Sequence, residues 1–118
     1  MDGIALIQKL AVAAIVATAF LHSDLRADAA DGQRIVIEIR SLKFLPGSQP
    51  ISPGDVVVWR NMDIVPHTAT AKDSSWDSGL IGPGEEWETM ITAEMTQAYY
   101  CRFHPSMTAT LGIKPKSL

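Results

Sequence analysis

The fold is decided by residues 35–59, IVIEIRSLKFLPGSQPISPGDVVVW. Isoleucine recurs at every second position from Ile35 to Ile39, which is the period of a β-strand with one buried face. A segment rich in proline and glycine follows over residues 46–55 and favours turns. The stretch ends in residues 56–59, VVVW, whose β-branched and aromatic side chains favour a second strand. Two strands joined by turns predict β structure.

The same pattern continues to the C-terminus. Short apolar or alternating segments are separated by turns, and no segment after Ala30 keeps the 3.6-residue period of an amphipathic helix. Regularly spaced short strands with glycine and proline between them predict an all-β sandwich or barrel. The further strands are expected at residues 67–71, 87–92, 98–101 and 108–114.

Length and composition exclude several classes of protein. With 118 residues, the chain has the length of one domain. Apolar residues make up 47% and charged residues 19%, which excludes a wholly disordered chain. The formal net charge of -3 argues against nucleic acid as a partner, because duplex binders carry a basic excess. A single cysteine excludes an intramolecular disulfide framework, a four-cysteine zinc site and a four-thiolate iron–sulfur cluster.

The N-terminus has the pattern of an export signal. Residues 10–21, LAVAAIVATAFL, form a 12-residue apolar run, shorter than the roughly 20 residues needed to span a bilayer. The segment Ala27-Asp28-Ala29 fits the small-x-small rule for signal cleavage. We predict a cleavable signal helix over residues 1–29 and a mature domain over residues 30–118, periplasmic and without stable membrane association. An uncleaved anchor over residues 4–21 is the alternative.

Three potential metal ligands lie close together in the last third of the chain. Cys101, His104 and Met107 have the spacing C-x-x-H-x-x-M, in a loop between two predicted strands. His67 lies 34 residues before the cysteine, and the remaining histidine, His22, belongs to the predicted leader. Each residue alone is explained by core packing or by a hydrogen bond. Together they indicate a metal site, because an exported free thiol oxidises unless something protects it.

The chemistry of these ligands favours copper. One thiolate and two imidazoles form a trigonal set, and a thioether adds a weak axial ligand, which is the blue-copper arrangement. Zinc favours four strong nitrogen, sulfur or oxygen ligands, whereas magnesium and calcium favour oxygen. We therefore expect one type 1 copper ion per chain. Its expected ligands are His67, Cys101, His104 and Met107.

At these residues the chain resembles the small blue copper proteins, the cupredoxins, which include plastocyanin, pseudoazurin and amicyanin. The two-residue gaps between Cys101, His104 and Met107 are of the amicyanin type. The resemblance covers nearly the whole predicted mature chain. Its other matching positions are Phe44, Pro46, Ile51, Gly54-Asp55, Val58-Trp59, Asn61, Val65-Pro66-His67-Thr68, Trp76-Asp77-Ser78-Gly79-Leu80 and Pro83-Gly84.

The resemblance implies a Greek-key β-sandwich with copper at one end. It implies that His67 and His104 are equatorial ligands through ring nitrogens. Cys101 would supply the thiolate, and Met107 would be axial. It also implies transfer of single electrons through the edge of His104 between redox proteins, a donor dehydrogenase and an acceptor cytochrome or oxidase. One departure concerns Thr68, where many relatives have an asparagine that steadies the thiolate region.

Two surface features have open interpretations. Phe103, Pro66 and Pro105 form either an apolar docking surface or ordinary loop packing. The glutamates of segment 85–88 follow a Pro-Gly turn, and they either steer a basic partner or belong to a solvated loop.

The leading hypothesis for function is a monomeric, mobile electron carrier that transforms no substrate. An enzyme is disfavoured because four protein ligands leave the metal no open position for a substrate. Periplasmic copper storage, delivery or resistance is the alternative. Such proteins cluster additional methionine or histidine ligands, whereas Met62, Met90 and Met95 are scattered in this sequence.

Overall fold

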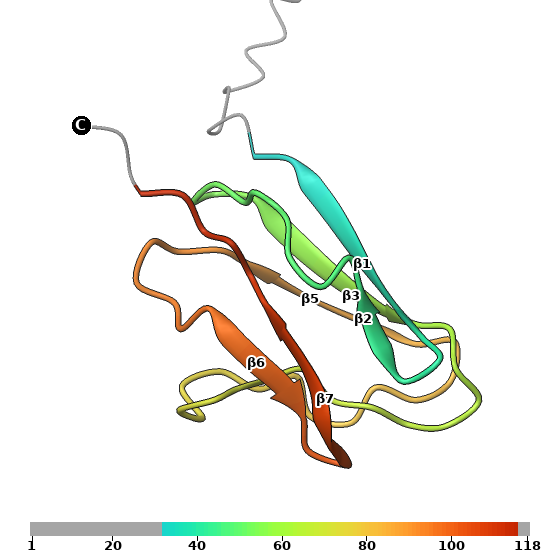
Figure 1. Cartoon of the computed structure of the whole chain (residues 1–118). Coiled ribbons are helices and arrows are strands. Elements are labelled where there is room, and N and C mark those ends of the chain that lie inside the picture. The colour runs from blue at the N-terminus through green and yellow to red at the C-terminus, as the bar shows by residue number, and fades with distance from the viewer. Residues whose placement is uncertain (1–31, 116–118) are drawn as a thin grey trace, which may run out of the picture.

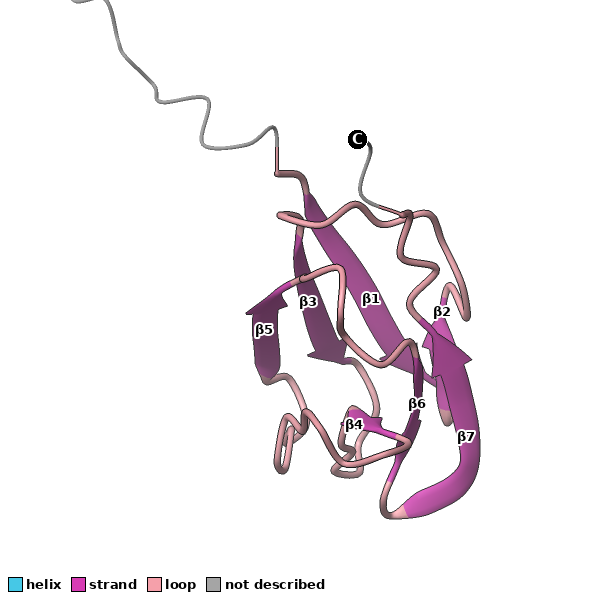
Figure 2. Cartoon of the chain, turned by 90° about the vertical axis from the view of Figure 1, so that its left-hand side faces the viewer, coloured by secondary structure: helices cyan, strands magenta, loops and turns pink. Residues whose placement is uncertain are grey.

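The computed structural model describes residues 32–115 and gives them an all-β architecture (Figures 1 and 2). These residues contain no helix, and hence none that is long and apolar enough to cross a membrane. The predicted signal helix and its cleavage site after Ala29 lie outside the described residues. The strands are β1 (Arg34–Arg40), β2 (Lys43–Leu45), β3 (Val56–Asn61), β4 (Thr70–Ala71), β5 (Glu86–Met90), β6 (Ala98–Cys101) and β7 (His104–Thr110).

The strands lie in two layers (Figure 2). One sheet has the order β2-β1-β3-β5, and the other has the order β4-β6-β7. Strands β1 and β3 are parallel, whereas the other paired strands are antiparallel. The inward side chains of both sheets form one buried cluster. Ile37 and Ile39 lie in it, so the alternation in the sequence correctly predicted the buried face of β1.

Aromatic rings fill the middle of the core. Trp59 on β3 is fully buried, and its ring centroid lies 5.6 Å from Trp76, 5.3 Å from Trp87 and 5.7 Å from Tyr99. Buried aromatic pairs prefer tilted or edge-to-face arrangements such as these, which stabilise the core beyond the burial of apolar area. Burial raises the pKa of the Tyr99 phenol. Its hydroxyl group and Trp59 Nε1 have no hydrogen-bond partner among the described residues. The three tryptophans are therefore a packing unit.

The β6–β7 hairpin differs from the prediction. The sequence pattern predicts a loop at His104 and Met107 and a last strand from residue 108, whereas β7 begins at His104. Only Arg102 and Phe103 form the turn, because Cys101 pairs directly with His104 next to a β-bulge. Pro105 in the sequence argues against a strand at this position. A proline fits there because β7 is an edge strand, where a missing ladder donor is tolerated.

The sequence pattern does not predict strand β2, because this strand is only three residues long. Strand β2 pairs with β1 through the two-residue turn of Ser41 and Leu42, whose φ angles are +51° and +59°. Positive φ at both central residues is the geometry that suits the twist of a hairpin, and it usually selects asparagine and glycine. The Ser-Leu pair carries no such signal in the sequence.

At the end of the molecule opposite the β6–β7 turn, the segment after β7 packs against the segment before β3. Ile51 and Ile113 form a parallel bridge, and Ile51 N donates to Gly112 O at 3.1 Å. Gly112 has φ of +47°, and a Cβ built on it would lie 2.5 Å from Gln49 O. Both ends of the described chain lie here, and the β6–β7 turn lies at the opposite end (Figures 1 and 2).

The outer face of the larger sheet carries paired charges. Arg60 contacts Glu86 at 2.8 Å across β3 and β5, and Arg34 contacts Glu88 at 2.5 Å. Glu85 accepts a hydrogen bond of 3.0 Å from Gly82 N. Glu86 and Glu88 therefore lie in strand β5 and not in a solvated loop, and all three glutamates of segment 85–88 are paired within the described chain.

Candidate metal centre

The β6–β7 hairpin supplies a thiol and an imidazole. Cys101 is the last residue of β6, fully buried, and His104 is the first residue of β7, half-buried. Their cross-strand pairing places Cys101 Sγ 3.8 Å from His104 Nδ1. The tight turn therefore converts a two-residue gap in the sequence into contact between two potential ligands.

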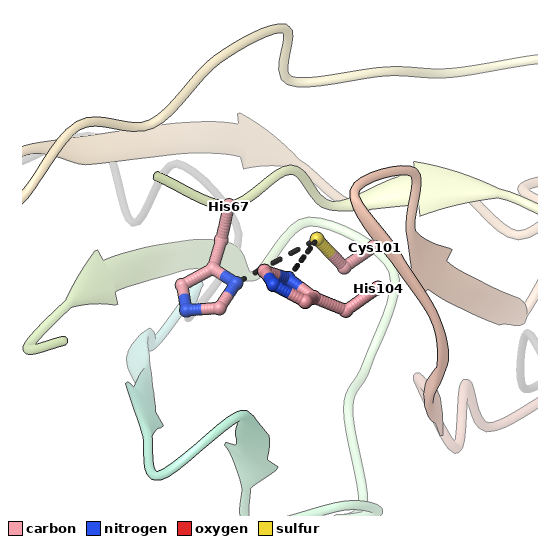
Figure 3. A group of neighbouring side chains, drawn as sticks. All are labelled: His67, Cys101 and His104. Atoms are coloured by element: carbon pink, nitrogen blue, oxygen red, sulfur yellow. Dashed lines mark hydrogen bonds between the residues drawn. The ribbon is translucent and has the colours of Figure 1, made fainter. Parts of the chain in front are cut away.

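The second imidazole comes from the segment before β4. His67 is fully buried and is held by two backbone hydrogen bonds with Ile81, of 3.0 Å and 2.8 Å. Its Nδ1 lies 3.6 Å from Cys101 Sγ. Figure 3 shows both imidazole rings directing a nitrogen at the same sulfur. The ligand atoms of His67, Cys101 and His104 all lie within 4.8 Å of one another.

This geometry fits a first-row metal ion. Nitrogen and sulfur ligands lie about 2.0–2.3 Å from such an ion, so two ligands in a trigonal set are roughly 3.5–4.0 Å apart. The two separations between nitrogen and Cys101 Sγ, 3.6 Å and 3.8 Å, agree with that spacing. A thiolate with two imidazoles is the donor set that suits copper.

Met107 lies in the same buried region. It is 4% exposed and belongs to the same core cluster as Cys101. Together with Leu42, Phe44 and Leu45, it also lines the groove between β7 and β2. Three of the four candidate ligands named from the sequence thus gather at one end of the sandwich, and together with Met107 from the core cluster that contains Cys101 the set fits a type 1 copper site.

The Asp63 carboxylate orients the ring of His67. Asp63 Oδ2 lies 2.8 Å from His67 Nε2, and the carboxylate also accepts hydrogen bonds from Ser41 N at 2.7 Å and Leu42 N at 3.0 Å. Since a carboxylate only accepts, Nε2 carries the proton and Nδ1 keeps a free lone pair facing Cys101. Burial raises the pKa of Asp63, but the Leu42 amide, His67 and the Ser41 amide outweigh it and lower the pKa.

Nothing in the sequence pattern predicts a role for Asp63, and Thr68 stands out there only as a departure from the family pattern. Thr68 N donates to Cys101 Sγ at 3.4 Å, and Thr68 Oγ1 accepts from Arg102 N at 2.9 Å. The threonine therefore joins the two ligand-bearing segments. The only sequence signal for Asp63 is weak: it is a carboxylate four residues before His67.

Solved structures similar to this chain are cupredoxins, although no protein-family model matches it. Mutants of amicyanin, in a reduced state and in a Cu(I) form, are 26% and 25% identical, cover 75% of this chain and 88% of their own, and have a TM-score of 0.61. A purple cupredoxin from Nitrosopumilus maritimus is 24% identical, covering 70% of this chain and 99% of its own, with a TM-score of 0.61.

In one further similar structure, the part that matches this chain belongs to a larger protein. The Cu-containing nitrite reductase from Thermus scotoductus SA-01 is 19% identical and has a TM-score of 0.62. The match covers 71% of this chain but 23% of the reductase. The chain thus shares its fold with these copper proteins, and the resemblance expected from its motifs is confirmed.

Proposed function

We propose, from a cupredoxin fold whose thiol and two imidazoles meet at one end, that this protein is an exported blue copper protein carrying single electrons between redox partners. The observation that supports the proposal most directly is the approach of His67 Nδ1 and His104 Nδ1 to within 3.6 Å and 3.8 Å of Cys101 Sγ. The proposed ligands are His67, Cys101 and His104, with Met107 in the axial position.

Bound copper would supply a one-electron couple between Cu(II) and Cu(I). The chain contributes rigid placement of the donors. Cys101 is held by its buried strand and by the Thr68 amide, and His67 is held by Ile81 and Asp63. Donors that are fixed in the folded chain serve both oxidation states with little movement, which favours fast electron transfer.

The surface around the site supports transient docking of a redox protein. Phe103 in the β6–β7 turn is 47% exposed, and in the segment before His67 the exposures are 93% for Ile64 and 37% for Val65. These apolar side chains, with the exposed Pro66 and Pro105, flank the two histidines along the chain. A small apolar surface of this kind suits short-lived complexes. We propose a dehydrogenase as the donor and a cytochrome or oxidase as the acceptor.

One observation favours copper storage or delivery as a second candidate. Met90 and Met95, scattered in the sequence, line the same surface groove beside Trp76. Soft thioethers bind Cu(I). The groove contains no histidine or cysteine, so we rank this candidate below electron transfer. A similar fold occurs in the nitrite reductase, but four protein ligands leave no open position for a substrate, so we do not propose an enzyme.

The visible spectrum of the full-length chain, expressed with its leader and loaded with Cu(II), tests the proposal. We expect a strong blue band that bleaches on reduction, one copper per chain, and loss of the band in Cys101→Ser. Bound copper without the band would favour storage or delivery. A protein that binds no copper would refute both candidates.

The predicted processing of the chain is tested in the same preparation. We propose a Greek-key monomer of residues 30–118 in the periplasm. Intact mass would then correspond to cleavage after Ala29, and size-exclusion with light scattering would give the monomer mass. A mass that retains residues 1–29 would instead support the anchor.

A further inference from the structure

Four residues form a closed ring of hydrogen bonds behind Cys101. Arg102 N donates to Thr68 Oγ1 at 2.9 Å, and Thr68 Oγ1 lies 2.9 Å from Thr70 Oγ1. Thr70 Oγ1 donates to Asp77 Oδ1 at 3.0 Å. The Arg102 guanidinium closes the ring at 3.1 Å from Asp77 Oδ2. The ring joins the residue after the thiol to the residue after the first imidazole.

The direction of the hydrogen bonds follows from the acceptor at the end. The Asp77 carboxylate only accepts, so the single proton of the Thr70 hydroxyl is committed to it. The Thr68 hydroxyl must therefore donate to Thr70 Oγ1, which leaves Thr68 Oγ1 free to accept from Arg102 N. The three hydrogen bonds from Arg102 N through Thr68 and Thr70 to Asp77 therefore run in one direction, and bonds in such a chain polarise and strengthen one another.

The ring runs from the buried site to the surface. Thr68 and Thr70 are fully buried at 0% and 1% exposure, whereas the side chains of Asp77 and Arg102 are 38% and 43% exposed. Burial raises the pKa of Asp77, but the Gly79 amide, the Thr70 hydroxyl and Arg102 together lower it. The carboxylate at the end of the ring is therefore ionised at neutral pH.

Among the four residues of the ring, Thr68 is the one that donates a hydrogen bond to the thiol. Its amide points at Cys101 Sγ from 3.4 Å, and its hydroxyl group ties it to Arg102, the next residue after the thiol. We propose that Thr70 and Asp77 are positioning residues that set the reduction potential of the metal site by holding Thr68 against Cys101. The proposal rests on the proposed copper function, since it concerns the potential of that site.

The sign of the effect follows from the bond to sulfur. An N–H group that donates to a thiolate draws electron density from it and so favours the reduced metal. Loosening Thr68 would weaken that bond and lower the potential. Thr70→Val breaks the ring without a change of charge or shape, and valine suits the strand position. Thr70→Ser keeps the hydroxyl and serves as the rescue variant.

The chain offers a matched control on a neighbouring loop. Thr96 Oγ1 donates to the Asp73 carboxylate at 2.5 Å, so Thr96→Val also removes a threonine hydroxyl from an aspartate, with no link to the candidate ligands. Reduction potentials of the copper-loaded proteins are measured by redox titration. Amide hydrogen exchange of Arg102 in the metal-free proteins gives a readout independent of copper.

We expect a lower potential in Thr70→Val and Arg102 exchange roughly tenfold faster, as for loss of about one hydrogen bond. Thr70→Ser and Thr96→Val should match the wild type in both measurements. A potential that does not move in Thr70→Val overturns the proposal, as does an equal shift in Thr96→Val, which would indicate general loosening. A wild-type protein without a blue band is a different failure, that of the copper function itself.

Discussion

A single carboxylate, that of Asp63, connects His67 to a hairpin turn whose Ser41 lies 22 residues before Asp63. Asp63 accepts from His67 Nε2 and from the amides of Ser41 and Leu42, so the ring of His67 is oriented by the tip of the β1–β2 hairpin. Partners of this kind fix the tautomer of a ligating histidine and raise its basicity. Asp63 therefore links the orientation of the buried imidazole to that turn.

Replacement of Asp63 should weaken copper binding. We expect Asp63→Ala to lower the affinity for Cu(II) by about 10- to 100-fold, because His67 loses its hydrogen-bond acceptor. Competition with a chelator of known affinity measures the change. Asp73→Ala, which removes a carboxylate that does not contact a candidate ligand, should bind copper like the wild type. Equal affinity in Asp63→Ala and wild type would contradict the orienting role.

Asp73 predicts a dependence of stability on acid pH. The Ser75 hydroxyl, Thr96 and the Ser75 amide lower the pKa of Asp73 from 3.8 to about 2. A pKa that is lower in the folded state stabilises the fold above pH 4, and the contribution is lost as pH falls toward 2. In metal-free protein, Asp73→Asn should flatten the fall of the urea midpoint over this range. Because Asp73 is exposed, the effect is small, and identical pH profiles would show that its hydrogen bonds are absent in solution.

At the scale of elements, the β1–β2 turn holds a leucine in a costly conformation. Leu42 has φ of +59° and is 47% exposed. A left-handed backbone costs an L-residue roughly 1–2 kcal/mol, whereas glycine adopts it freely. Leu42→Gly should therefore stabilise the protein by about 1 kcal/mol in thermal unfolding. Leu80→Gly is the control, since Leu80 is 61% exposed without a positive φ, and it should destabilise.

The closing segment after β7 depends on the absence of a side chain at Gly112. Gly112→Ala places a Cβ 2.5 Å from Gln49 O at a φ of +47°, so backbone must move. Gly84→Ala, at φ of +77° with open space around the Cβ, isolates the cost of the backbone angle alone. We expect about 1 kcal/mol for Gly84→Ala and at least about 2 kcal/mol more for Gly112→Ala in urea unfolding. Equal losses would mean that the contact with Gln49 relaxes freely.

Patterns that repeat along the chain were predictable, and contacts across it were not. The isoleucines of β1 predicted its buried face, and the C-x-x-H-x-x-M spacing predicted Cys101 and His104, two of the three residues whose ligand atoms meet at the site. Strand β2 has only three residues, too short for periodicity to reveal. The bonds of Asp63 to Ser41 and of Arg102 to Thr68 join residues 22 and 34 apart, which only the folded sheets bring together.

For the whole molecule, metal binding and folding are expected to be linked. The donors are placed only when both β4 and β7 pair with β6, so an ion that binds them favours the native state over the unfolded chain. With free Cu(II) at 100 times the dissociation constant, the gain is about 2.7 kcal/mol. Calorimetry should show a higher melting temperature for the loaded wild type and a much smaller rise for Cys101→Ser. An equal rise in both proteins would place the bound copper elsewhere.

The locality of the β6–β7 turn has a kinetic consequence. Cys101 and His104 are three residues apart and meet by closing one short loop, whereas His67 joins them only through the pairing of β4 with β6, some 30 residues apart. Short loops close within nanoseconds to microseconds, but distant strand pairing is slow. The hairpin can therefore capture an ion with its own thiolate and imidazole before the sandwich assembles. Refolding with copper present should show fast uptake through sulfur, followed by slow appearance of the final colour as His67 arrives.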